Sequence, residues 1–422
     1  MTVEPGTKFD REYSFWRIEL NAVGGSGRLL QIRNGEKMQI AIGYLRGWVG
    51  VSILFSTRET PLAVQGKVNE NSRIVVSCSG HYLALYVDGR LFDEDWPIGS
   101  LNLKDAECRL ARGKIEFFDE ALQRPVQSEG YIHVTQGWKP EGYNTSVGDC
   151  MPFFDGTTLR LYYLFDRRHH TSRWGLGGHQ WAQISTTDLK TWRTHPFALR
   201  IDKEEEGSLC TGSVILCNNR YYAFYAVRTI DGSPAWLTWA VSDDGIRFTK
   251  TGKVFHLSNT YNTRSARDPC VFKDEKGRFH MLVTTSIGKG EEARGCLAHI
   301  ESADLETWEE KDPFITLDIP EQPECSDYFC YNGFYYLIYS TAALGRYLVS
   351  TDPFGPWKAF ENNIVIDTSS AVPKSCLWHN ERLLFASWVM DVPQWGGSLM
   401  LHEAKQRADG SLEFFPLPEL RA

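Results

Sequence analysis

Ser185-Thr186-Thr187-Asp188-Leu189, which leads to Trp192, is the stretch that decides the fold, because similar stretches return later in the chain. The equivalents begin at Ser242, Ser302 and Ser350 and lead to Phe248, Trp308 and Trp357. Their Asp residues recur at intervals of roughly 50 to 60 residues, and a period of this length with several strands per unit is typical of β-propeller blades. An apolar, strand-like pair precedes each stretch, and the strand-rich end after Leu383 supplies one more unit. We therefore predict five blades.

The repeated Asp and aromatic residues themselves have a structural explanation. An Asp at the start of a turn accepts hydrogen bonds from nearby backbone amides. The Trp or Phe that follows is expected to pack between blades. We therefore look for catalytic groups outside this repeat.

The chain before the repeats forms a separate block, from about Phe9 to Val134. His81-Tyr82-Leu83-Ala84-Leu85-Tyr86-Val87 alternates with period two and runs through Asp88-Gly89 into Arg90-Leu91-Phe92, which predicts a β-hairpin with a tight turn. The hairpin resembles those of laminin G or concanavalin-like β-sandwiches. We predict an all-β protein with a sandwich over residues 1–137 and a five-bladed propeller over 138–422. We expect the sandwich to pack on the propeller and to have no chemistry of its own.

The composition excludes several classes of function. The chain has 422 residues and a net charge of −8, and with no basic block it is not expected to bind nucleic acid. It contains no apolar run long enough to span a membrane and no signal peptide at Met1, so a cytoplasmic location is expected. The ten Cys form no Cys-x-x-Cys pair, and we expect reduced thiols, no metal and no cofactor. The sequence leaves a homo-oligomer open.

Three acidic residues lie where strand-like runs begin, next to a turn-forming residue or a Cys. They are Asp149 in Val147-Gly148-Asp149-Cys150, Asp268 in Arg267-Asp268-Pro269, and Glu324 in Pro323-Glu324-Cys325. A carboxylate beside apolar strand residues is costly to bury unless it is paired or hydrogen-bonded. The inner strands of a propeller line its central channel, so these three groups are expected to converge there. Convergent carboxylates are what glycoside hydrolysis requires.

In this order, the motifs resemble those of the β-fructosidases, glycoside hydrolase families 32 and 68. A further similar stretch is Trp174-Gly175 followed by residues 178–192, and Thr211-Gly212-Ser213-Val214 looks like the small-residue motif that comes next. The resemblance implies that Asp149 is the nucleophile, Asp268 the transition-state stabiliser and Glu324 the acid/base. It implies a retaining hydrolase of fructosides or short fructans, with carbohydrate as its partner. The substrate-binding residues are then expected to be Arg267, Trp181, His179, Asp166, Trp174, Thr211 and Cys325.

The sequence also departs from the family. Gly148-Asp149-Cys150 replaces the usual Asn-Asp-Pro surroundings of the nucleophile, Asp166 replaces a Gln, and the sandwich precedes the propeller instead of following it. Other functions stay open: a fructosyl transferase, an arabinoside-active propeller that inverts configuration, or a non-catalytic carbohydrate-binding protein. An inverting enzyme would hold its carboxyl groups farther apart than the roughly 5 Å of a retaining one.

Asp166-Arg167-Arg168-His169-His170 is an unusual charged run for a site that binds neutral sugars. The interpretation that we favour is a solvated loop. The alternative is a subsite in which Arg167 and Arg168 bind a charged group such as a phosphate.

Overall fold

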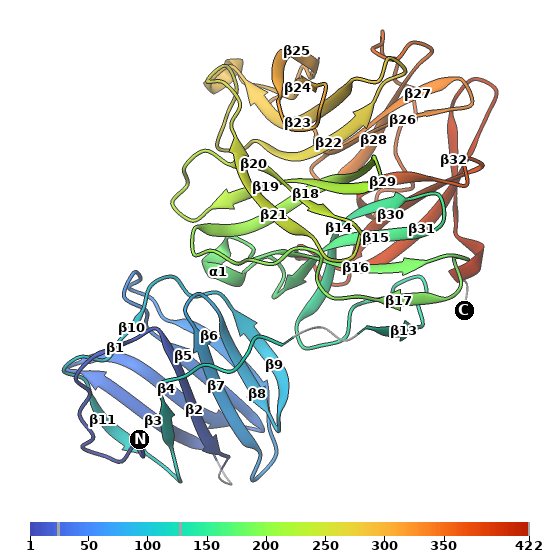
Figure 1. Cartoon of the computed structure of the whole chain (residues 1–422). Helices are drawn as coiled ribbons and strands as arrows, with labels where there is room; N and C mark the ends of the chain where they lie inside the picture. The colour runs from blue at the N-terminus through green and yellow to red at the C-terminus, as the bar shows by residue number, and fades with distance from the viewer. Residues whose placement is uncertain (23–25, 126–128, 421–422) are drawn as a thin grey trace.

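The computed structural model describes residues 1–22, 26–125 and 129–420, and these are almost entirely β-structure. Figure 1 shows a β-sandwich, in blue, beside a larger propeller that runs from green to red. The predicted all-β fold with these two parts is confirmed. Within the described residues, no helix has both the length and the apolar character needed to cross a membrane.

Two five-stranded antiparallel sheets make up the sandwich. The first has the order β11 (Glu107–Ala111), β3 (Gly27–Asn34), β4 (Lys37–Leu45), β5 (Trp48–Ile53) and β6 (Leu62–Lys67). The second has the order β12 (Glu116–Phe118), β2 (Phe15–Asn21), β7 (Arg73–Ser79), β8 (Leu83–Val87) and β9 (Arg90–Asp95). A short pair joins β1 (Glu12–Tyr13) to β10 (Leu101–Asn102).

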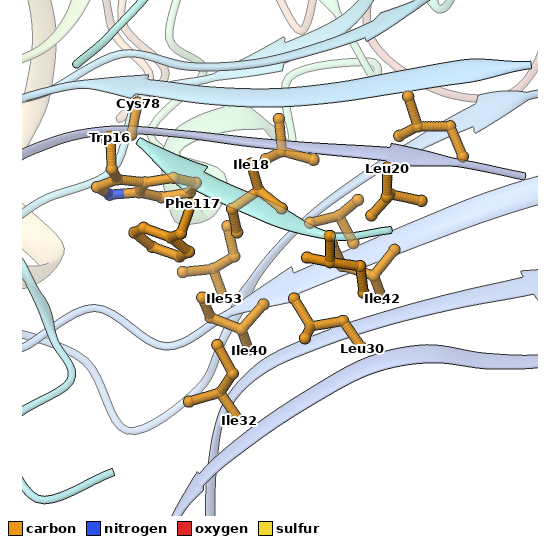
Figure 2. Close-up of a cluster of buried hydrophobic side chains, with 14 of the residues drawn as sticks. Trp16, Ile18, Leu20, Leu30, Ile32, Ile40, Ile42, Ile53, Cys78 and Phe117 are labelled. Atoms are coloured by element: carbon orange, nitrogen blue, oxygen red, sulfur yellow. The ribbon is translucent and has the colours of Figure 1, made fainter. Parts of the chain in front are cut away.

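The sandwich core lies between these sheets (Figure 2). Successive strand residues point to opposite faces, and in β2 the inward positions are Trp16, Ile18 and Leu20, all buried. The predicted hairpin is present as β8 and β9, and both residues of its turn, Asp88 and Gly89, have positive φ. Such a turn matches the twist of the flanking strands.

The propeller contains five blades of three to five antiparallel strands. Blade I has β14 (Thr145–Phe154), β15 (Leu159–Arg167), β16 (Gln180–Thr186) and β17 (Trp192–Thr194), with β13 (Gly130–Ile132) at its edge and the short helix α1 (Ser172–Gly175) after β15. Blade II has β18 (Glu206–Cys217), β19 (Arg220–Thr229), β20 (Trp236–Ser242) and β21 (Thr249–Phe255). Blade III has β22 (Arg267–Lys273), β23 (Phe279–Ile287), β24 (Arg294–Ser302) and β25 (Glu309–Thr316), with the 3₁₀ turn η1 (Gly290–Glu292).

The last two blades complete the ring. Blade IV has β26 (Glu324–Tyr331), β27 (Phe334–Thr341) and β28 (Leu344–Ser350). Blade V has β29 (Ser370–Trp378), β30 (Arg382–Met390), β31 (Gly397–Gln406) and β32 (Leu412–Pro416), followed by the 3₁₀ turn η2 (Pro418–Leu420). Single residue pairings, Val147 with Gly397 and Leu344 with Ala371, link blades I, V and IV.

The repeated turns have the structural role that the sequence predicts. The Asp188 carboxylate accepts hydrogen bonds from two backbone amides, those of Lys190 and Thr191, and Asp244 and Asp304 do the same in their turns. The aromatic residues pack across blade boundaries in the pairs Phe248–Tyr162, Trp308–Phe224 and Trp357–Phe314. These contacts fix the angle between neighbouring blades.

The sandwich packs on blade I through the charged run, so the predicted solvated loop is wrong. Arg168 bonds to the buried carboxylates of Asp93 and Asp95, and Arg167 Nη2 lies 3.2 Å from Oε1 of Glu94. A buried charge is costly unless it is paired, and the acidic end of β9 supplies these partners. Both guanidinium groups are thus engaged by the sandwich, and the alternative that they bind a substrate phosphate is also wrong.

Candidate active site

Each of the five inner strands contains a register shift at the same level of the propeller. The unpaired dipeptides are Gly148-Asp149 in β14, Cys210-Thr211 in β18, Asp268-Pro269 in β22, Cys325-Ser326 in β26 and Val372-Pro373 in β29. A β-bulge bends its strand and redirects a side chain, and bulges are common beside active sites. Asp268, Cys325 and Val372 have positive φ within these bulges. The five bulges therefore turn one ring of side chains toward the propeller axis.

These bulges surround a cavity of about 290 Å³. All three predicted carboxylates, Asp149, Asp268 and Glu324, line it. The remaining lining residues are Leu164, His170, His179, Ser208, Cys210, Thr211, Arg228, Arg267, Cys325, Ala343, Val372, Trp388 and Trp395. The structure thus brings together side chains from all five blades.

Asp149 is held from three sides. Thr211 Oγ1 donates a 2.5 Å hydrogen bond to Oδ2, Trp388 Nε1 donates to Oδ1 at 3.1 Å, and Cys325 Sγ lies 3.4 Å from Oδ2. These three contacts restrict the orientation of the Asp149 carboxylate.

Gly148 allows this placement. A Cβ at this position would lie 2.2 Å from Cη2 of Trp395 and 3.1 Å from the carbonyl oxygen of Leu164. The indole of Trp395 is thus packed directly on the backbone that precedes Asp149. The departure from the family's usual residues coincides with a close contact that only glycine permits.

Arg267 connects the other two carboxylates. Its Nη2 donates a 2.7 Å hydrogen bond to Oε1 of Glu324, and its Nε lies 3.6 Å from Oδ2 of Asp268. Nη1 bonds to the side chain of Gln322 and to the Ser265 carbonyl oxygen, so the guanidinium is fixed in place. The guanidinium of Arg267 therefore contacts the carboxylates of both Glu324 and Asp268.

Asp268 is almost completely buried. Burial raises the pKa of its carboxyl to about 6, although the guanidinium of Arg267 opposes the shift, and the carboxylates of Glu324 and Asp149 add to it. The backbone amide of Cys325 donates a 3.1 Å hydrogen bond to its Oδ2. Asp268 can thus change its protonation state near the lower end of the physiological pH range.

One wall of the cavity consists of stacked rings. His179 stacks on Trp395 with 4.4 Å between ring centroids, and His170 lies against both rings. Asp166 is fully buried behind this wall, where its Oδ1 bonds His179 Nε2 at 3.1 Å and the amide of His170 at 2.8 Å. Asp166 therefore positions the two histidines and does not itself line the cavity.

Two predicted substrate-binding residues lie away from the cavity. Trp181, on β16, is fully buried in the apolar cluster between blades I and II, where its Nε1 donates to the Cys210 carbonyl oxygen. Trp174 packs against the sandwich core, with the guanidinium of Arg58 over its ring. This geometry contradicts a direct substrate contact for either residue. Of the remaining predicted residues, Arg267, His179, Thr211 and Cys325 do line the cavity.

The sequence alone did not reveal several other lining residues. Trp388 and Trp395 come from blade V, and no motif distinguishes them from the other tryptophans. His170 belongs to the charged run, but its contact with the cavity depends on the turn after β15. Arg228 lies near the end of β19, with no charged neighbour in sequence to mark it.

One group of three potential metal ligands is found in the described residues. It consists of His280, His299 and Glu301, none of which lines the cavity. Convergent carboxylates are the groups that acid-catalysed glycosyl transfer uses.

The chain is similar to several known proteins. Residues 152–353 match the model of the "Glycosyl hydrolases family 32 N-terminal domain"; this range includes Asp268 and Glu324 and begins just after Asp149. A sucrose-6-phosphate hydrolase from Vibrio alginolyticus is 26% identical over 275 residues, which cover 57% of this chain and 55% of that protein. One from Bacillus subtilis (strain 168) is 31% identical over 180 residues, which cover 40% of this chain and 36% of that protein. The chain thus spans about half or less of these two relatives.

Solved structures show the same fold. A sucrose-6-phosphate hydrolase from Lactobacillus gasseri superposes with a TM-score of 0.56 at 17% identity, over 68% of this chain and 63% of that one. A fructan 1-exohydrolase IIa variant from Cichorium intybus, in complex with 1-kestose, gives 0.55 at 16% identity, over 68% of this chain and 61% of that one.

Proposed function

We propose that this chain, which carries a glycoside hydrolase family 32-like propeller, is a retaining glycoside hydrolase that acts on β-fructofuranosides. The observation that carries the proposal is the convergence of Asp149, Asp268 and Glu324 from three blades into one cavity.

In the first step, Glu324 protonates the leaving oxygen while Asp149 attacks the anomeric carbon. The C–O bond to the leaving group breaks, and an ester forms between the sugar and Asp149. Thr211 and Trp388 hold the carboxylate in the attacking orientation. Two donors fixed before the reaction reduce the reorganisation needed to reach the transition state.

In the second step, Glu324 removes a proton from water, and the water oxygen attacks the anomeric carbon of the ester. Asp149 leaves as a carboxylate, and the sugar is released with its original configuration. Asp268 accepts hydrogen bonds from ring hydroxyls as positive charge develops on the sugar. Its ionised form is the one that can do so.

The ion pair between Arg267 and Glu324 has a consequence for the first step. An acid catalyst must present a proton to the leaving oxygen, and here Oε1 of Glu324 is occupied by Nη2 of Arg267. We propose that the bound leaving group takes the place of this ion pair, while Gln322 and the Ser265 carbonyl keep Arg267 in position.

For the substrate, we propose a fructoside whose leaving part carries an anionic group such as a phosphate. Arg228 supports this, because it lines the cavity and its nearest polar contacts are long, 3.4 Å to the Leu176 carbonyl oxygen and 3.5 Å to His170 Nε2. Burial, with the nearby His179 and Arg228, lowers the pKa of His170 to about 4, so this ring is neutral at pH 7 and can donate one hydrogen bond. Both relatives described above are sucrose-6-phosphate hydrolases. A phosphorylated substrate is consistent with a cytoplasmic location.

The experiment is a substrate panel of fructosides, fructans, their phosphates and arabinosides, with sugar release and anomeric configuration followed by NMR. Retained configuration on fructosides is the expected result. Inversion, or turnover of arabinosides alone, would overturn the proposal, and binding without turnover would indicate a non-catalytic protein.

A matched pair of variants tests the anionic subsite. Arg228→Ala should raise KM for a phosphorylated fructoside by roughly ten- to hundred-fold, since a charge-assisted hydrogen bond contributes about 1.5–3 kcal/mol, and should leave kcat unchanged. Arg220→Ala, on the same strand but exposed, is the control. If neutral and phosphorylated substrates are turned over equally, and Arg228→Ala changes the turnover of neither, Arg228 does not form an anionic subsite.

A further inference from the structure

We propose that His280, His299 and Glu301 form a binding site for Zn²⁺ in blade III, separate from the central cavity. One ligand atom from each residue lies within 4.8 Å of the other two. Nothing in the proposed glycosidase chemistry uses these residues.

The antiparallel pairing of β23 and β24 brings the three residues together. His280 is directly opposite Glu301, and His299 is two residues before Glu301 on the same strand. Residues i and i+2 of a strand share one face, and directly opposed residues share it as well. The sheet thus presents two imidazoles and one carboxylate on one surface.

The separations fit a single ion. His280 Nδ1 lies 2.9 Å from His299 Nε2 and 3.7 Å from Glu301 Oε1. Ligands at about 2.0–2.1 Å in a tetrahedral zinc site lie about 3.3 Å from one another. The third separation, between His299 and Glu301, lies within 4.8 Å, so these two side chains would have to approach each other by up to about 1.5 Å to admit the ion. Two His and one Glu leave the fourth position for water, as in open zinc sites.

The surroundings supply the second layer that metal-bound histidines need. Asp274 Oδ2 lies 3.2 Å from His280 Nε2. A carboxylate there holds the proton on Nε2 and leaves the Nδ1 lone pair for a metal. Without metal, the hydrogen bond between the two rings then has His299 Nε2 as its donor and His280 Nδ1 as its acceptor. Metal binding would move that proton to Nδ1 of His299, with no proton released.

The surroundings of Glu301 leave one of its carboxylate oxygens facing the histidines. Arg278 lies 3.3 Å and Lys311 4.0 Å from Oε2 of Glu301, which leaves Oε1 facing His280. The rings of Phe272, Phe314 and Phe354 enclose the two histidines.

The test uses the full chain without an affinity tag, treated with a chelator and then titrated with Co²⁺, whose visible absorption reports tetrahedral coordination. Zn²⁺ should displace Co²⁺ at one equivalent and should raise Tm. His299→Ala and Glu301→Gln should abolish the cobalt spectrum, and Asp274→Asn should weaken binding by roughly 10- to 100-fold. His133→Ala, an exposed histidine on another part of the chain, should change nothing.

Circular dichroism of each variant without metal separates loss of binding from loss of fold. The proposal is overturned if the folded wild type binds no Co²⁺ or Zn²⁺. It is equally overturned if folded His299→Ala and Glu301→Gln bind as the wild type does.

Discussion

Arg267 Nη2 lies 2.7 Å from Oε1 of Glu324, and the two residues begin the inner strands of adjacent blades. The pair therefore joins blade III to blade IV at the cavity. It also couples the proposed acid/base to Asp268, which the same guanidinium approaches through Nε.

Replacement of Arg267 should impair catalysis more than binding. Arg267→Lys keeps the charge but cannot reach Glu324, Asp268 and Gln322 together, because an ammonium lacks the planar fork of a guanidinium. We expect kcat to fall roughly ten- to hundred-fold, the equivalent of one charge-assisted hydrogen bond. Steady-state kinetics measure this, with Arg407→Lys, an exposed pair with Glu413, as the control. Unchanged kcat would mean that the pair has no catalytic role.

The ionised carboxylate of Asp268 should lower the free energy of unfolding at neutral pH. Its folded-state pKa of about 6 lies above the ordinary value of 3.8 for an Asp carboxyl. A raised carboxyl pKa means that the folded state binds more protons, so this group's contribution to stability is present below pH 3.8 and is lost as the pH rises through 6. Asp268→Asn should therefore raise the free energy of unfolding at pH 8, by up to about 3 kcal/mol, and the gain should vanish near pH 4.

Denaturant unfolding at both pH values gives this difference directly. A variant that is less stable at pH 8 would show that the hydrogen bonds of Asp268 outweigh its burial. The same ionisation predicts that wild-type kcat/KM falls as the pH drops below about 6.

The ion pairs between the sandwich and blade I should be essential for stability. Arg168→Ala would leave the buried carboxylates of Asp93 and Asp95 without their cation. Removal of one partner of a buried pair costs about 3–5 kcal/mol. Thermal and denaturant unfolding measure the loss, with the exposed Arg90→Ala as the control. A loss no greater than that of the control would show that the domains do not depend on this contact.

Gly148 should tolerate no side chain. In Gly148→Ala, the new Cβ would meet the Trp395 ring at 2.2 Å, and overpacking of this kind costs about 1–3 kcal/mol. A displacement of Asp149 by about 1 Å would reduce kcat roughly 100-fold. Gly50→Ala, where a Cβ has no neighbour within 4 Å, is the matched control. Wild-type kcat in Gly148→Ala would show that the close packing is not needed.

Much of the architecture was accessible from the sequence, because a turn Asp with an aromatic residue after it recurs in four of the five blades. Asp149, Asp268 and Glu324 were found outside this repeat, from their places beside strand-like runs. Asp268 and Glu324 do lie at the starts of inner strands, whereas Asp149 lies within β14. The five aligned bulges were not accessible, since a register shift depends on how two strands pair and leaves no residue signature. Asp268 and Cys325 adopt positive φ although neither is glycine.

The ion-pair partners of charged residues could not be predicted from the sequence either. Arg167 and Arg168 carry no mark in sequence that pairs them with Glu94, Asp93 and Asp95, more than seventy residues earlier. Trp181 and Trp388 illustrate the same limit. Both are strand tryptophans, yet Trp181 packs between two blades and Trp388 bonds the proposed nucleophile.

The central claim is that Asp149 becomes covalently attached to the sugar and that Glu324 is the acid/base. The most direct measurement is peptide mass spectrometry of Glu324→Gln after incubation with a fructoside that has an activated leaving group. The first step then needs little acid help, whereas the second lacks its base, so a fructosyl ester should accumulate on the peptide that contains Asp149. Asp149→Asn should form no adduct, and Asp243→Asn, an exposed turn residue, should turn over normally. An adduct on another residue, or none in a Glu324→Gln variant that still releases fructose, would contradict the account.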